Sequence, residues 1–383
     1  MVLARAIRPP VPEGTGGIYP AVGRYLRRWL WAILCGLTPL GARGADDWPT
    51  FRRDAQRSGV TPATLALPLA LAWTHRPTQG PAPAWPAPTA TNYAIMYGPL
   101  RQTLTFDHAF HAVADAESVY FGSSADDSIY CLDATTGAFR WRFVTEGPVR
   151  LAPALSRGTV FAGSDDGQLY ALDARTGRRL WSYRAGPDDR RLPGNGRMIS
   201  PWPVRCGIVV SGEQVFFTAG LFPNEGVFLC AVEAATGKEV YSRRLGFSAQ
   251  GTMLASEDRL FLATGRSAFQ SCGLRDGMPL LRHGVSNPWK TNLVGGTTAL
   301  VADGILATGP SEDGQFHWFN LAATNPLLRA SCDCAIVAKD RIYLLDNGHL
   351  SAVDRSTYLD KPVRPPPLWS VPTRRATTMI LAG

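Results

Sequence analysis

The sequence predicts an all-β fold built from a repeated four-stranded unit, and three observations support this. A block of 40 residues recurs along the chain. Runs of alternating Val, Tyr and Phe are separated by Asp-Gly or Asn-Gly, which favour tight hairpin turns. Gly and Pro supply 38 and 30 of the 383 residues, a turn-rich composition. Because one small sheet cannot bury both faces, the units must stack, and radial stacking gives a β-propeller of four-stranded antiparallel blades.

The repeat is clearest at residues 119–143, 160–184 and 215–245. Each copy has an acidic residue, a glycine four positions later and an aromatic residue four positions after that. We expect the acidic side chain to bond the turn backbone, the glycine to be left-handed and the aromatic ring to pack against the next blade. The residues are Asp133, Gly137 and Trp141; Asp173, Gly177 and Trp181; and Glu233, Gly237 and Tyr241.

This unit resembles the pyrroloquinoline-quinone-type (PQQ-like) propeller repeat, whose signature is Ala-x-Asp-x-x-Thr-Gly-x-x-x-Trp. The best match runs from Ala171 to Trp181. The resemblance covers residues 46–383. This part of the chain is similar to two groups of proteins, the exported propellers of outer-membrane assembly and the propellers of quinoprotein dehydrogenases. The segment 47–59 also resembles the start of exported propellers.

The predicted elements follow in chain order. Leu69–Trp73 supplies an outermost strand, and a Pro-rich surface loop spans 76–106. Further outermost strands are expected near 141, 181, 241, 281, 325 and 369, which makes six complete blades. Residues 377–383 then begin another inner strand. A ring closed between the two ends would lack two strands, so we expect a C-terminally incomplete propeller with seven or eight blades in the full protein.

Residues 1–45 have the layout of a signal peptide. Arginines precede the apolar stretch 29–40, and the small residues 41–45 follow. We therefore expect an exported protein, periplasmic or extracellular. A buried N-terminal helix and a lipoprotein site at Cys35 are alternatives. The apolar stretch is shorter than the roughly 20 residues that a membrane helix needs, so no transmembrane span is predicted.

The charge and the cysteines exclude some classes of protein. Residues 1–45 contribute +5 of the formal net charge of +8, and the rest shows no basic run with interleaved aromatics, so no nucleic-acid partner is predicted. Cys131 and Cys230 lie in apolar strands and are interpreted as small buried hydrophobes. Cys332 and Cys334 lack the spacing of a zinc site. Disulfides among the six cysteines after Cys35 stay open.

A cluster of polar residues falls just before or within predicted innermost strands, near the propeller axis. Three guanidiniums converging there would make an anion site for a carboxylate or phosphate. The alternative is that they neutralise neighbouring carboxylates or lie solvated at the rim. The candidate ligand-binding residues are Arg150, Asn195, Arg197, Ser200, Trp202 and Arg205.

No metal site and no catalytic residue are predicted. The pairs Asp126-Asp127 and Asp165-Asp166 lie in hairpin turns, where Asp is favoured for backbone reasons. His108 and His111 are expected on opposite faces of the chain. The resemblance implies PQQ and calcium at the axis of the dehydrogenases, but the adjacent cysteines of the alcohol dehydrogenases are missing here.

Three functions follow from these observations. The first is an exported non-catalytic propeller that binds a protein partner or a small anionic ligand, or that acts as a scaffold. The second is a PQQ- and calcium-dependent oxidoreductase, and the third is the binding portion of a larger enzyme. No cofactor is predicted, and PQQ with calcium remains the alternative.

Overall fold

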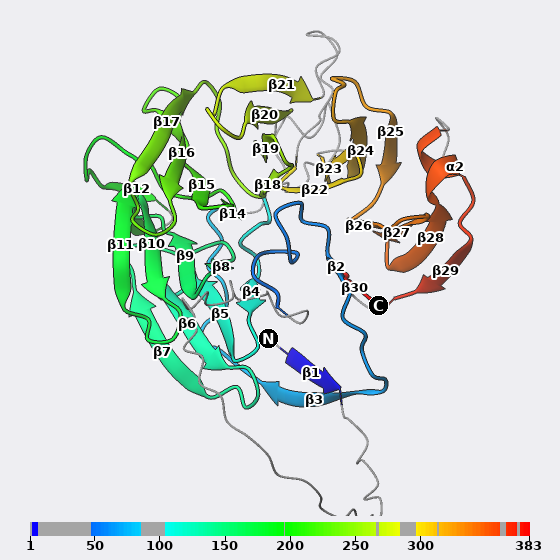
Figure 1. Ribbon diagram of the computed structural model, residues 1–383, viewed down its shortest axis with the longest axis horizontal. Helices are drawn as coiled ribbons and strands as arrows, with labels where there is room; N and C mark the ends of the chain where they lie inside the picture. Colours follow the sequence, from blue (N-terminus) through cyan, green and yellow to red (C-terminus); the bar gives the residue numbers. More distant parts are fainter. Residues whose placement is uncertain are drawn as a thin grey trace, which may run out of the picture.

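Six four-stranded antiparallel sheets follow one another along the chain. The computed structural model describes residues 2–6, 47–85, 104–194, 196–265, 268–283, 296–311, 314–360, 365–373 and 376–383. The sheets surround a common axis, and the first strand of each lies innermost (Figure 1). The predicted β-propeller with six complete blades is therefore confirmed within the described part of the chain.

Each blade is a meander from the axis outward, with consecutive strands paired. The bounds are, for blade 1, β4 (Ala112–Ala114), β5 (Ser118–Ser123), β6 (Ser128–Asp133) and β7 (Phe139–Val144); for blade 2, β8 (Ala154–Ser156), β9 (Thr159–Gly163), β10 (Gln168–Asp173) and β11 (Arg179–Arg184); for blade 3, β14 (Val209–Ser211), β15 (Gln214–Ala219), β16 (Val227–Glu233) and β17 (Glu239–Leu245). They are, for blade 4, β18 (Met253–Ala255), β19 (Arg259–Leu262), β20 (Phe269–Gly273) and β21 (Pro279–His283); for blade 5, β22 (Thr298–Ala302), β23 (Ile305–Gly309), β24 (Gln315–Asn320) and β25 (Leu328–Ser331); for blade 6, β26 (Cys334–Val337), β27 (Arg341–Asp346), β28 (His349–Asp354) and β29 (Trp369–Pro372).

The remaining elements lie outside the six blades or join their strands. β1 (Val2–Ala6) pairs antiparallel with β3 (Leu69–Thr74), and β2 (Val60–Thr61) pairs parallel with β30 (Leu381–Ala382). β12 (Leu192–Gly194) and β13 (Arg197–Ile199) form a small hairpin between blades 2 and 3, and the helix α2 (Arg355–Asp360) joins β28 to β29.

Three expectations are corrected by these bounds. The outermost strand of blade 5 begins at Leu328 rather than near 325, because a turn precedes it. Arg197 lies in the inserted hairpin and not at an innermost strand, which begins only at Val209. The all-β prediction missed the helix α2, where residues 355–360 replace the short turn of the other blades.

The repeat motif joins successive blades as predicted. The carboxylate of Asp133 accepts hydrogen bonds from the backbone and the hydroxyl of Thr136, and Gly137 has a φ of +73°. A Cβ at Gly137 would lie 2.6 Å from the Trp73 ring, so the ring of β3 covers the turn of blade 1. The same contact joins Trp141 to Gly177, Trp181 to Gly237 and Tyr241 to Gly277.

The core lies between the blades. One buried cluster combines Val113 and Tyr120 of blade 1 with Val160 and Tyr170 of blade 2, and the other described clusters join later neighbours in the same way. The six described cysteines are buried free thiols, which confirms the interpretation of Cys131 and Cys230 as core residues.

Some predictions fall largely outside the described residues. Of the signal peptide predicted at 1–45, only residues 2–6 are described, and residues 86–103 of the Pro-rich loop and Asn195 are not. None of the described helices is long and apolar enough to cross a membrane.

Residues 47–61, which we call the axial arm, cross the centre of the ring (Figure 1). Backbone hydrogen bonds join the arm to first strands around the ring. Their partners are Trp48 with Ala114, Pro49 with Leu155, Ala55 with Ala255, and Gln56 with Val301.

Two arginines of the axial arm reach the remaining blades. Arg57 is 1% exposed and donates to the carbonyls of Ile208 (2.8 Å) and Met253 (3.0 Å). Arg52 donates to the carbonyl of Ala335 at 2.6 Å. The arm therefore contacts all six complete blades.

Candidate functional site

The candidate site lies at the end of the ring opposite most contacts of the axial arm. In a meander, the turn between the second and third strands and the connection to the next blade share one end of the blade. The arm bonds mostly near the other end of the first strands, at residues such as Ala114 and Ala255. Six charged residues from blades 1 to 3 and their connections form what we call the polar mouth: Asp107, Asp127, Arg150, Asp165, Arg197 and Arg205.

Asp165 is the centre of the polar mouth. It lies in the turn between β9 and β10, and Arg205 approaches it in a bidentate manner, with both nitrogen–oxygen distances at 2.7 Å. Nε of Arg150 donates to the same carboxylate at 2.7 Å. The side chains of both arginines are 2% exposed and that of Asp165 is fully buried. Two of the predicted guanidiniums thus converge, but on an anion that the chain itself supplies.

Asp107 extends this network toward the segment that follows β3. Nη1 of Arg150 donates to Oδ2 of Asp107 at 2.9 Å and to the carbonyl of Ala82 at 2.6 Å. The backbone N–H of Ala84 donates to the same Oδ2 at 2.6 Å. Two arginines and two aspartates therefore balance in charge and fasten residues 82–84 across blades 1 and 2.

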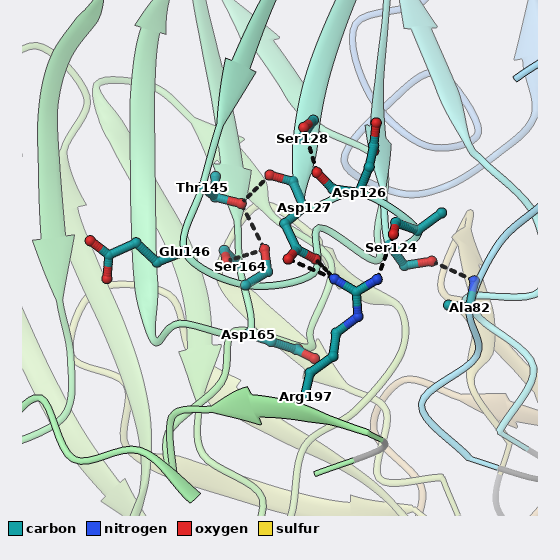
Figure 2. Close-up of polar contacts among 12 residues, drawn as sticks. Ala82, Ser124, Asp126, Asp127, Ser128, Thr145, Glu146, Ser164, Asp165 and Arg197 are labelled. Atoms are coloured by element: carbon teal, nitrogen blue, oxygen red, sulfur yellow. Dashed lines mark hydrogen bonds and ion pairs between the residues drawn. The ribbon is translucent and has the colours of Figure 1, made fainter. Parts of the chain in front are cut away.

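Arg197 forms a separate, more exposed pair (Figure 2). Its Nη1 lies 2.6 Å from both carboxylate oxygens of Asp127, in the turn between β5 and β6, and its Nη2 donates to the carbonyl of Ala125. The two side chains are 32% and 26% exposed. Burial raises the pKa of Asp127, and the neighbouring guanidinium of Arg197 opposes that shift.

Ser200 and Trp202 support the backbone. The Ser200 hydroxyl accepts a hydrogen bond from the Trp202 backbone N–H at 3.1 Å, and both residues are 1% exposed. The Trp202 ring donates to the carbonyl of Glu225 at 2.9 Å, and the guanidinium of Arg190 lies 4.9 Å from the ring centre. These predicted ligand residues are therefore occupied by contacts within the protein.

The acidic residues of the polar mouth do not fit a calcium site that would accompany PQQ. Calcium takes six to eight oxygen ligands, and its charge would meet the guanidiniums of Arg150 and Arg205. Among the described residues, no group of three or more His, Cys, Asp or Glu side chains could hold a metal ion. His108 is exposed, and His111 pairs with the carbonyl of Phe106 at 2.8 Å.

Neither Asp107 nor the central role of Asp165 is evident from the sequence. The sequence pattern predicts only that Asp165 is a turn residue, and it does lie in the turn between β9 and β10. Its neighbour Asp166 fits that interpretation fully. Its carboxylate accepts from the Tyr170 hydroxyl at 2.7 Å and from two backbone N–H groups, and burial raises its pKa. No local signal separates these adjacent aspartates, because the arginines that bind Asp165 come from other connections.

The comparisons with known proteins agree with the propeller fold. Residues 70–200 match the family described as outer membrane protein assembly factor BamB. Within this stretch the chain carries propeller repeats of the PQQ-like type. BamB from Moraxella catarrhalis is 16% identical to this PQQ-like propeller over 68% of this chain and 75% of its own, with a TM-score of 0.50. No curated protein matches the sequence.

Two dehydrogenases share the fold of this PQQ-like propeller. A europium-containing methanol dehydrogenase is 12% identical, with 86% of this chain and 85% of the enzyme covered and a TM-score of 0.55. A quinohemoprotein alcohol dehydrogenase from Pseudomonas putida HK5 is 13% identical, with 80% and 57% covered and a TM-score of 0.51. At such identities, the likeness establishes the fold.

Proposed function

We propose that this chain is an exported, non-catalytic propeller that binds a protein partner and acts as a scaffold. The single observation that carries the proposal is that the buried arginines of the polar mouth are already paired with aspartates of the same chain. Arg150 and Arg205 are buried and both bind Asp165, so a small anion would have to displace a buried carboxylate. Anion binding is then left to Arg197, whose side chain is 32% exposed.

Exposed apolar residues on the outermost strands, which we call the outer rim, favour a protein partner. Leu180, Val240 and Leu280 are 44%, 42% and 49% exposed, and each directly precedes the fourth residue after the motif glycine, which is Trp181, Tyr241 and Leu281. Single exposed apolar residues are common, but this row recurs at one place in three successive blades. The name of the family that matches residues 70–200, an outer membrane protein assembly factor, supports a role in binding other proteins.

Site-specific photocrosslinking in the source cell tests this proposal. A benzophenone amino acid replaces Leu180 or Val240 on the rim, and the matched control replaces Arg157, which is exposed at a turn between the first two strands of blade 2. We expect a discrete crosslinked protein from the rim positions alone. Equal crosslinking from all three positions, or none from the rim, would contradict the scaffold role.

The oxidoreductase alternative has its own measurement. Purified protein is titrated with PQQ and calcium while tryptophan fluorescence is followed. The scaffold proposal expects no saturable quenching, because the carboxylates of the polar mouth are already bound to arginines. Saturable quenching that requires calcium would favour an enzyme, or the binding portion of one. Mass spectrometry of the secreted chain tests export, with a new N-terminus expected near residue 46.

A further inference from the structure

The outermost strands of blades 2, 3 and 4, which are β11, β17 and β21, follow one another along one side of the ring (Figure 1). The ring nitrogen of Trp181 donates to the carbonyl of Ala234 in blade 3 at 3.1 Å, and the hydroxyl of Tyr241 donates to the carbonyl of Leu274 in blade 4 at 3.1 Å. The surface along these strands is therefore continuous. We call residues 173–184, 233–244 and 273–283 the basic surface.

The basic surface carries more positive than negative charge. Its three segments contain nine arginine or lysine residues and four aspartate or glutamate residues. All of the basic residues except Arg184 are exposed. The exposed ones are Arg175, Arg178, Arg179, Lys238, Arg243, Arg244, Arg275 and Arg282.

The carboxylates of the basic surface do not pair with these charges. Each carboxylate accepts a hydrogen bond from a hydroxyl or a backbone N–H. The pairs are Thr176 with Asp173, Thr236 with Glu233, Tyr183 with Glu239, and Met278 with Asp276. None of the nine basic side chains forms an ion pair with a described residue. In blade 1, by contrast, Arg140 and Arg142 pair with Asp133 and Asp126 at 2.7 and 3.2 Å.

Exposed apolar side chains lie among the unpaired charges, at Leu180, Val240 and Leu280. In each strand the register with the third strand shifts at this residue, which forms a β-bulge. A bulge bends the strand edge and opposes the addition of a further strand. A partner on this surface would therefore cross the outermost strands and would not extend the sheets.

Protection of the strand edges alone does not explain where the charge lies. Basic residues on an edge strand oppose aggregation, so every outermost strand would need them for that purpose. However, β25 contains a single basic residue, Arg329, and β29 contains none. The concentration of unpaired charge on blades 2 to 4 therefore indicates a binding surface.

We propose that the basic surface binds an acidic segment of a partner protein, whose apolar side chains contact Leu180, Val240 and Leu280. The inference rests on the proposed scaffold function and names the chemistry of the partner. The positive potential attracts the acidic segment, and the apolar contacts add affinity. The outermost strands follow the curve of the ring (Figure 1), so a chain segment can contact all three blades, whereas a flat membrane would contact fewer.

A synthetic peptide tests this proposal on the full chain. The probe is a fluorescein-labelled peptide of about 16 residues that repeats Glu-Leu-Glu-Ser. One control peptide repeats Lys-Leu-Lys-Ser, which reverses the charge, and the other repeats Glu-Ser-Glu-Ser, which removes the apolar side chains. We expect saturable anisotropy with the probe, at least about tenfold weaker binding of either control, and weaker binding of the probe at high salt.

Variants of the protein locate the binding. Arg179→Glu and Arg282→Glu reverse exposed charges on blades 2 and 4, and each is expected to weaken the probe at least about fivefold. The matched control Arg329→Glu makes the same change at an exposed position on the outermost strand of blade 5, and it should stay within about twofold. Circular dichroism and the thermal midpoint establish that each variant folds.

Three outcomes would overturn the proposal: no saturable binding of the probe, equal binding of either control peptide, or equal weakening by Arg329→Glu. Binding to vesicles of phosphatidylglycerol and phosphatidylcholine that Arg179→Glu abolishes, with no binding of the probe, would also overturn it, because the surface would then bind a membrane.

Photocrosslinking distinguishes a failure of this inference from a failure of the scaffold function. With the benzophenone amino acid at Val240, we expect Arg179→Glu and Arg282→Glu together to reduce the crosslinked protein. A crosslink that persists unchanged in this variant would leave the scaffold function standing and would refute the acidic partner.

Discussion

At the scale of single residues, the buried charges of the polar mouth determine its behaviour. Asp165 neutralises two guanidiniums that have almost no contact with water. An ion pair of this kind contributes little net stability, but removing one partner leaves a buried charge uncompensated. Asp165 therefore matters more to folding than its place in a hairpin turn suggests.

The variant Asp165→Asn tests this dependence. It keeps the shape of the side chain and removes the charge, so we expect the free energy of unfolding to fall by about 3–5 kcal/mol. The control is Asp188→Asn, whose side chain is 44% exposed and pairs with Arg190, and its loss should stay below about 1 kcal/mol. Urea titrations measure the free energy of unfolding of both variants. Similar small decreases in the two variants would contradict the idea that Asp165 compensates the two buried arginines.

His283 makes stability depend on pH. Its ring is fully buried between Phe261 and Phe319, and burial lowers its pKa below the ordinary value of 6.5. Below about pH 6.5 the unfolded chain binds a proton that the folded chain resists, so stability falls as the pH falls. His283→Phe should reduce the loss between pH 7.5 and 5, whereas replacing the exposed His349 should not. Urea midpoints at both pH values check this, and an unchanged slope would contradict it.

At the scale of elements, the contact between an aromatic ring and a glycine determines how neighbouring blades fit. The glycine serves two purposes, because its positive φ closes the turn and its missing side chain admits the ring of the preceding blade. The local motif therefore encodes a tertiary contact.

Gly177→Ala and Gly158→Ala separate these two purposes. Both glycines have a positive φ, but a Cβ at Gly177 would lie 2.6 Å from the Trp141 ring, whereas a Cβ at Gly158 would meet nothing within 4 Å. We expect a loss of about 1 kcal/mol for Gly158→Ala from backbone strain, and about 2–4 kcal/mol for Gly177→Ala from strain and overpacking. Equal thermal shifts would show that the ring contact adds nothing.

At the scale of the whole molecule, the axial arm joins the first strands of blades on different sides of the ring. Arg57 alone bonds carbonyls of blades 3 and 4, and its burial lowers its pKa to about 10. Because the arm contacts all six complete blades, it ties their sheets together through bonds at the centre of the ring.

The packing of the whole ring also protects the thiols. Burial raises the pKa of Cys131, Cys206 and Cys272 to about 11, and the thiolate is the reactive form. We expect iodoacetamide to spare the six described cysteines in the native protein at pH 8 and to modify all of them in guanidinium chloride. Mass spectrometry of the labelled peptides identifies each modified cysteine. Rapid labelling of any of the six in the native protein would contradict the burial of that thiol.

The sequence by itself determined the repeat, the number of complete blades among the described residues, and the turn chemistry of the three clearest copies. Hairpin turns and blade contacts depend on residues a few positions apart, such as Asp133, Thr136 and Gly137, so a linear pattern records them. It also placed Arg150 and Arg205 near the axis and left open whether they would meet a ligand or neighbouring carboxylates.

Only the tertiary structure decided that question. Asp165 lies 15 residues from Arg150 and 40 from Arg205, and Asp107 comes from a connection outside the repeat. The pairing of β2 with β30, which joins residues 60–61 to residues 381–382, likewise appears only in the folded ring. Closing a ring brings together residues that no local period relates, and the burial of their charges then fixes which contacts they make.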